Sequence, residues 1–318
     1  MANRNEEVNK IKNEDSQVPS TSVEKVLIKK QAKRKLLWKE IGTLIKKKKL
    51  SFVCFIFLSI LILIAIFAPI IIPYPDDING GSQLEKKFQP PNMEHLFGTD
   101  ERGRDLFSRV IYGTRIAFQV GLISLSLSAA LGFFFGAGVL YFGNRVSETI
   151  KRICEIFQKF PALSFLFSIG IATLVGASMK SAIIAISVSW WPWYTIPILK
   201  QIDSLKERGL VEATHSLDGS AWIIIFKRIV SSNNMALFLS RVLIDMGTII
   251  LMVAALGFMG LGAQPPELEW GLLMNIGREF LFTCWWYVTF PGIFTIMTVL
   301  AFGITGKGLK EHAILKTR

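Results

Sequence analysis

Residues able to do chemistry are few in this sequence of 318 residues. The three histidines, His95, His215 and His312, stand in three separate polar segments, so their spacing predicts no metal site. The three cysteines form no C-x-x-C pair, which favours small buried apolar side chains over disulfides or metal ligands. No phosphate-binding loop of the G-x-x-x-x-G-K-S/T type occurs. We therefore predict no catalytic residue, no metal site and no bound cofactor in this chain.

One pair of opposite charges falls inside an apolar segment. Arg241 and Asp245 are four residues apart, so on a helix they share one face. Charges inside a membrane span are costly and tend to face protein or water. Two interpretations stay open, a structural ion pair that neutralises itself and a contact with a transported solute.

The elements that carry these residues are predicted from the apolar composition. Hydrophobic residues make up 51% of the chain and charged residues only 19%, whereas an ordinary soluble domain has about 25% charged residues. An apolar run of about twenty residues is long enough to cross the hydrocarbon layer of a membrane. We predict an all-α integral membrane protein with six transmembrane helices, over residues 52–72, 116–142, 160–175, 182–198, 235–261 and 285–304.

The remaining segments divide the chain around these spans. Residues 1–35 are polar and are expected to be disordered. Residues 36–50 have apolar positions at helical spacing among lysines, which predicts an amphipathic helix in the lipid headgroup layer. The predicted divisions are a first transmembrane segment ended by prolines (51–73), an extracytoplasmic loop (74–114), a core with five spans (115–306) and a cytosolic C-terminus (307–318).

The distribution of cations predicts the orientation. With the N-terminus inside, the inside segments hold 27 Lys and Arg residues and the outside segments hold 7. Cytoplasmic segments carry an excess of Lys and Arg, so both termini are predicted to be cytosolic in a multi-pass cell membrane protein. The net charge of +12 lies mainly in residues 1–50, which favours contact with membrane lipid over nucleic acid.

Glycine and aromatic clusters suggest how the spans pack. Small residues allow close helix approach in membranes, although a direct role in a transport pathway stays open. The glycine clusters are Gly132, Gly136, Gly138 and Gly257, Gly260, Gly262. The aromatic group Trp285, Trp286 and Tyr287 at the outer end of the last span is typical of an interfacial belt.

The inside segment of residues 200–234 is too long for a bare connection. Its apolar residues recur at helical spacing on both sides of Asp218-Gly219, and Ser220 is suited to cap the second helix. Two short cytosolic helices are typical of a docking surface, and the alternative is a pair of surface helices that only tether the spans.

Several motifs resemble those of a known family. Glu212-Ala213-Thr214, with Leu217, Gly219 and Ser220, resembles the "EAA" loop of ABC importer permeases, from which the chain departs at Asp218. The segment after the first span resembles the signature of the C-type permease of dipeptide and oligopeptide importers, and it contains Gly98, Thr99, Asp100, Gly103, Arg104 and Asp105. Further matches follow in order at residues 190–192, 204–208, 260–271 and 306–309.

The resemblance implies a transmembrane fold of the type I ABC importer class. It implies a second, homologous permease subunit, two ABC ATPase subunits that hold ATP and Mg, and an extracellular solute-binding protein. The loop of residues 200–234 would be the coupling element, with Glu212 contacting the ATPase, Ala213 allowing close packing and Gly219 making the turn. The implied function is import of dipeptides or oligopeptides by alternating access, and import of nickel or a metallophore complex is the alternative.

Two other classes of function have candidate residues in the sequence. A secondary carrier needs intramembrane ionisable residues, for which Arg241 and Asp245 are the candidates. A membrane enzyme needs acidic residues gathered at one face, for which Asp100, Glu101 and Asp105 are the candidates. Neither class is supported by motifs that cover as much of the chain as those that resemble the permease family.

Overall fold

The computed structural model describes residues 49–78, 80–139, 144–206 and 232–317. The chain divides into residues 1–49 and 50–318, and the helices below belong to the second unit, apart from Lys49 at the start of the first helix. The segments predicted over 1–35 and most of 36–50 lie outside the described residues, as do residues 207–231 of the predicted coupling loop.

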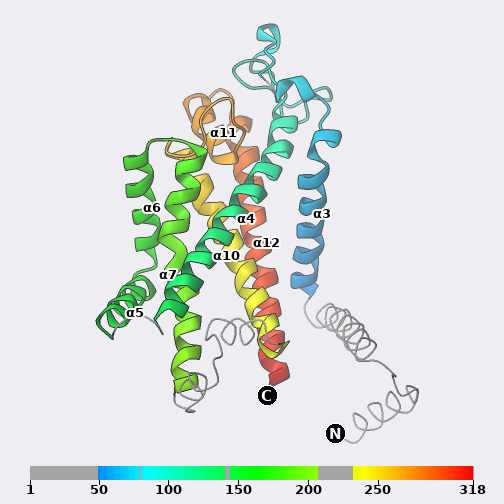
Figure 1. Cartoon of the computed structure of the whole chain (residues 1–318). Helices are drawn as coiled ribbons and strands as arrows, with labels where there is room; N and C mark the ends of the chain where they lie inside the picture. Colours follow the sequence, from blue (N-terminus) through cyan, green and yellow to red (C-terminus); the bar gives the residue numbers. More distant parts are fainter. Residues whose placement is uncertain (1–48, 79, 140–143, 207–231, 318) are drawn as a thin grey trace, which may run out of the picture. The chain divides into compact units, whose positions relative to one another are not determined.

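The described part of the chain is helical (Figure 1). Five helices are long and apolar enough to cross a membrane. A sixth span exists if the bent pair α5 and α6 is counted as one. The long helices are α3 (Lys49–Ile71), α4 (Leu106–Gly138), α7 (Met179–Lys206), α10 (Ser232–Phe258) and α12 (Trp286–Thr317). The shorter elements are η1 (Pro75–Asp77), η2 (Leu84–Lys86), α5 (Asn144–Lys159), α6 (Ala162–Val175), α11 (Trp270–Gly277) and η3 (Arg278–Phe280).

Several boundaries differ from the sequence prediction, among them α12, which continues to Thr317, and the two boundaries on either side of residues 74–105. Helix α3 continues through Pro69 and ends at Ile71, next to the residue before Pro73. A proline disfavours helical backbone at the residue before it, which accounts for the end of the helix just before Pro73. Helix α4 begins at Leu106, ten residues before the predicted start at 116. The first turns of α4 therefore belong to the segment that was expected to be loop.

Helix α5 occupies the charged segment between the predicted spans 116–142 and 160–175, for which no helix was expected. Its buried side chains Ile150 and Cys154 pack with Leu199 of α7, and its Phe157 ring lies 5.5 Å from Phe167 of α6. A sharp bend of 106° separates α5 from α6. The apolar run predicted as a full third span is thus a helix of 14 residues, α6, joined to an amphipathic helix.

Glycines let the long helices approach closely, as predicted for Gly132 and Gly136. A Cβ atom at Gly132 would lie 2.5 Å from Cβ of Tyr194, and one at Gly136 would lie 2.9 Å from Cβ of Ile198. Both contacts join α4 to α7. Gly247 and Gly306 do the same for α10 and α12, where an added Cβ would meet Phe302 and Ile244.

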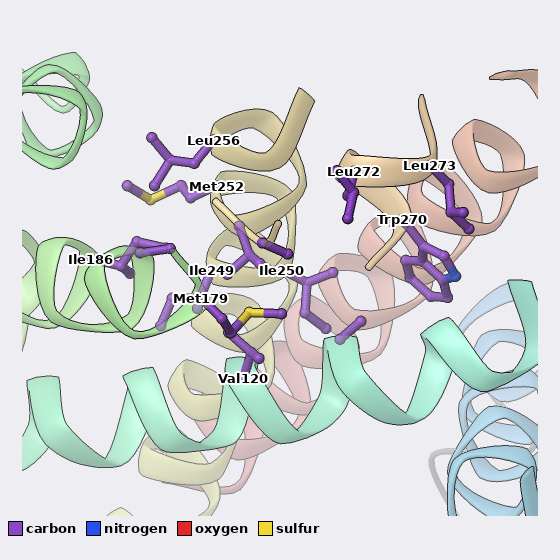
Figure 2. Packing of buried hydrophobic residues seen from close by; sticks show 14 of the residues in the cluster. Val120, Met179, Ile186, Ile249, Ile250, Met252, Leu256, Trp270, Leu272 and Leu273 are labelled. Atoms are coloured by element: carbon purple, nitrogen blue, oxygen red, sulfur yellow. The ribbon is translucent and has the colours of Figure 1, made fainter. Parts of the chain in front are cut away.

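The main hydrophobic core lies where α4, α7, α10 and α11 meet (Figure 2). Ile249 and Ile250 of α10 point toward Val120 of α4 and Ile186 of α7, and all four are buried. The residues between α3 and α4 lie with α11 at one end of this bundle, and the C-terminal end of α12 lies at the other (Figure 1). We call residues 74–105 the signature loop.

Candidate functional site

Asp100 is the centre of the signature loop. Its side chain is fully buried, and its Oδ1 accepts hydrogen bonds from the backbone N–H groups of Arg102 and Arg104 at 2.8 and 2.9 Å. Its Oδ2 accepts from Nε of Arg104 at 2.7 Å and from the Arg109 guanidinium. One carboxylate thus orders the loop backbone and holds two buried arginines, as a buried charge requires.

Asp105 joins the loop to α4. It is the N-cap of α4, and its Oδ2 accepts from the backbone N–H of Ser108 at 2.7 Å. Its Oδ1 lies 2.9 Å from Nδ1 of buried His95, and its own N–H donates to Asp77 at 2.7 Å. Burial raises the pKa of the Asp77 carboxyl. The hydrogen bonds of Asp105 therefore fix the loop to the first turn of α4.

Two glycines of the signature are required by backbone geometry. Gly98 and Gly103 have φ values of 72° and 74°, a region that disfavours side chains. A Cβ at Gly98 would lie 2.7 Å from Nε1 of Trp286, and one at Gly103 would overlap the carbonyl oxygen of Gln83. Thr99 completes the turn, because its hydroxyl donates to the Lys86 carbonyl at 2.6 Å.

The loop is bonded to the start of α12, which corrects the predicted aromatic belt. Tyr287 is fully buried, and its hydroxyl donates to Oε2 of Glu101 at 2.6 Å. Trp286 is also buried, and its indole N–H donates to the Thr99 carbonyl at 3.4 Å. Trp285 alone of the three is largely exposed. Two of the three aromatics therefore pack against protein, and a belt position fits only Trp285.

Helix α11 is bonded to α4 in a similar way. Trp270 is fully buried, and its indole N–H donates to the Val110 carbonyl at 3.0 Å. Gly113 allows this contact, since a Cβ there would lie 2.9 Å from the Trp270 ring. Sequence reasoning missed the roles of Trp270 and Tyr287, and the only signal for Trp270 was its place in the motif at 260–271.

Glu269 is a buried carboxyl that sequence reasoning also missed. It is the N-cap of α11, and its Oε2 accepts from the N–H of Leu272 at 3.0 Å. Gly257 and Gly271 crowd it, since a Cβ at Gly271 would lie 2.7 Å from Oε2 and one at Gly257 would lie closer still. Burial raises the pKa of Glu269 to about 7, because the charged form loses its hydration.

A cavity of about 290 Å³ opens between the signature loop and the chain around α11. Its polar lining comes from Glu101, Arg102, Arg104 and Arg109 on one side and from Glu267 on the other. Arg109 is only 3% exposed and Arg104 only 8%. Two buried guanidinium groups thus line a hollow at the loop end of the bundle.

The other predicted site residues lie elsewhere. Nε of Arg241 donates to Oδ2 of Asp245 at 2.6 Å, and the guanidinium carbon lies 5.3 Å from the centroid of the Trp193 ring. These contacts lie within and between α7 and α10, away from the signature loop. The predicted coupling residues Glu212, Ala213, Leu217, Gly219 and Ser220 lie outside the described residues. Among the described residues, no group of three or more His, Cys, Asp or Glu side chains is arranged to hold a metal ion.

Comparison with known proteins places this architecture in a family. Residues 128–314 match the binding-protein-dependent transport system inner membrane component family, and residues 37–91 match the N-terminal TM domain of oligopeptide transport permease C. The signature loop begins within the N-terminal match, which ends at residue 91, and continues into the interval between the two matches.

The regions matched in three relatives cover most of each relative and most of this chain. The dipeptide transport system permease protein DppC of Alkalihalophilus pseudofirmus is 35% identical over 86% of this chain and 88% of its own. The probable D,D-dipeptide transport system permease protein DdpC of Escherichia coli is 32% identical over 87% and 89%. The glutathione transport system permease protein GsiD of Escherichia coli is 30% identical over 86% and 89%.

These matches bear out the resemblance based on the sequence motifs. They identify a multi-pass inner membrane protein that serves as a transport component rather than an enzyme. The chain belongs to the family of binding-protein-dependent transport system inner membrane components, with an N-terminal segment of the oligopeptide permease C type.

Proposed function

We propose that this chain is one permease subunit of an ABC importer for short peptides. Family membership carries the proposal, because its members serve binding-protein-dependent transport. The names of three relatives support the substrate class, since dipeptides, D,D-dipeptides and glutathione are all short peptides. A second permease of the same family would supply the other half of the pore.

The proposed orientation has both termini in the cytosol and the signature loop outside. The excess of cations in residues 1–50 and 200–234 supports this orientation. An extracellular binding protein would then deliver the solute at the loop end of the bundle. Two ATPase subunits, with their ATP and Mg, would act at the opposite face.

Coupling is assigned to residues 200–234, with Glu212 in contact with the ATPase. Closure of the ATPase pair on ATP would push this segment, and the connected helices α7 and α10 would transmit the movement. The packing of Gly132 and Gly136 against α7 supports a rigid α4–α7 pair that moves as one. Arg241 and Asp245 are proposed to form a structural ion pair, in which the two charges neutralise each other within α10.

Replacement of Glu212 tests the coupling assignment. In the assembled transporter, Glu212→Ala should lower peptide uptake at least tenfold while the ATPase subunits still hydrolyse ATP. Glu24→Ala, which removes the same side chain from the polar N-terminal segment, should leave uptake unchanged. Unchanged uptake by Glu212→Ala, with the protein present at the normal level, would contradict the assignment.

A further inference from the structure

The cavity between the signature loop and α11 has an unbalanced charge on its loop side. Arg102, Arg104 and Arg109 supply three positive charges, whereas Asp100 and Glu101 supply two negative charges. Asp100 is shared by Arg104 and Arg109, and Glu101 is shared by Arg102 and Arg104. The three arginines and their ion-pair partners alone thus carry one net positive charge at this wall, so an anion placed there would be favoured.

Arg109, which lines the cavity, has a donor without a partner in the described part of the chain. Its single ion-pair partner among the described residues is Asp100, and its Nε is buried with no hydrogen-bond partner. A guanidinium has five N–H donors and binds a carboxylate in a bidentate manner. Of the described residues, Asp100 alone pairs with this buried guanidinium, so a ligand carboxylate close to it would be favoured.

The remaining lining suits a short peptide rather than an inorganic anion. Pro265, Pro266, Leu272 and Ile276 supply apolar wall on the side of α11. Glu267 is exposed at that side and makes no ion pair among the described residues, so it is available to an ammonium group. The volume of about 290 Å³ is at the lower limit of small-ligand pockets.

We propose that this cavity is a receiving site for short peptides, in which the arginine side binds the C-terminal carboxylate and Glu267 binds the α-ammonium group. The inference rests on the proposed function. The charged ends are common to all peptides, so such a site would accept many sequences. It would hold the solute on the permease after the binding protein releases it.

Direct binding to the assembled transporter, without its binding protein, tests the proposal. The probes are alanyl-alanine, its C-terminal amide and its N-acetyl derivative, and the measurement is saturation-transfer NMR or calorimetry. The free peptide should bind, and the amide should bind about tenfold more weakly because it lacks the carboxylate. The N-acetyl derivative should bind more weakly than the free peptide but should keep the dependence on arginine.

A matched pair of arginine variants, together with Glu267→Gln, separates this site from a general charge effect. Arg102→Gln removes a half-exposed lining arginine whose side chain makes one ion pair among the described residues, with Nε 3.8 Å from Glu101, so the fold should be kept. It should weaken binding of the free and N-acetyl peptides several-fold. Arg278→Gln removes an exposed arginine that does not line the cavity, and it should change nothing. Glu267→Gln should weaken binding of the free peptide but not of the N-acetyl derivative.

The proposal would be overturned by equal binding of peptide and amide, by equal binding to Arg102→Gln and wild type, or by no peptide binding. If Arg102→Gln instead weakens association of the binding protein, the cavity accepts an acidic side chain of that partner and the peptide site is wrong. ATP hydrolysis stimulated by the binding protein in the same preparation shows that the proposed function still holds. Loss of that stimulation in the wild type would count against the proposed function itself.

Discussion

The hydroxyl of Tyr287 donates a hydrogen bond of 2.6 Å to Oε2 of Glu101, and this bond ties the start of α12 to the signature loop. Glu101 also binds Arg104, whose guanidinium reaches Asp100. A chain of charged hydrogen bonds therefore runs from α12 through the loop to Arg109 in the first turn of α4. The loop that marks the family is thus a brace between two membrane helices.

The first prediction concerns the Tyr287 hydroxyl. Tyr287→Phe should destabilise the protein by about 1–3 kcal/mol, because it leaves a carboxylate with one fewer charged hydrogen bond. Tyr112→Phe is the control, since no hydrogen bond from the Tyr112 hydroxyl is found among the described residues. Thermal unfolding in detergent is the measurement. Equal midpoints for the two variants would contradict the bracing role of Tyr287.

The second prediction concerns the carboxylate of Asp100. Asp100→Asn leaves Arg104 and Arg109 buried without their shared anion, and loss of one partner of a buried pair costs about 3–5 kcal/mol. We expect the variant to accumulate poorly in the membrane. Asp76→Asn, an exposed carboxylate in the same loop, should accumulate normally. Normal amounts and normal thermal stability of Asp100→Asn would show that the network is not needed for folding.

The third prediction separates backbone conformation from crowding. Gly80 and Gly103 both have positive φ, of 99° and 74°, but a Cβ has open space at Gly80 and meets the Gln83 carbonyl at Gly103. Gly80→Ala should cost about 1 kcal/mol through backbone strain alone. Gly103→Ala should cost clearly more, as judged by thermal unfolding. Similar losses for the two variants would argue that the loop moves freely at Gly103.

The fourth prediction is a pH dependence from Glu269. Burial raises its pKa from the ordinary value of 4.5 to about 7, so the folded state holds more protons than the unfolded state between these values. Stability should therefore fall as pH rises from about 4.5 to 7 and should be level above that range, with a total cost of about 3 kcal/mol. Glu269→Gln removes the titrating group and keeps an acceptor for Leu272.

The comparison of wild type and Glu269→Gln isolates this contribution from other acids. Melting temperatures at pH 5, 6, 7 and 8 are the measurement. The variant should lose less stability than the wild type between pH 5 and 7, and the two curves should run parallel above pH 7. Parallel curves over the whole range would mean that Glu269 is not held in a raised-pKa environment.

The sequence was sufficient to predict the long apolar helices, because their signal is local. Helices α3 and α10 follow from uninterrupted apolar composition. The early start of α4 was not predicted, because a charged residue such as Arg109 is typical of a loop beside a membrane span. Only the structure shows that Asp100 neutralises Arg109 in the first turn of the helix. Helix α5 was missed because its many charges outweighed the helical spacing of Ile150, Cys154 and Phe157.

The candidate site was predicted in outline but not in its contacts. The motif identified Asp100, Gly103 and Arg104, yet it gave no indication of what they touch. Whether an aromatic residue faces lipid or protein depends on which helix lies beside it, and local sequence does not specify that. Tyr287 therefore looked like a belt residue, and its bond to Glu101 depends on contact between segments 186 residues apart.

Peptide import through this protein is expected to depend on both a binding protein and ATP. Its most direct test is uptake of labelled alanyl-alanine into proteoliposomes that contain the complete transporter. Uptake should require the binding protein outside and ATP at the ATPase face, and it should stop when either is removed. Uptake that continues without ATP on an ion gradient, or import of a nickel complex in place of the peptide, would contradict ATP-driven peptide import.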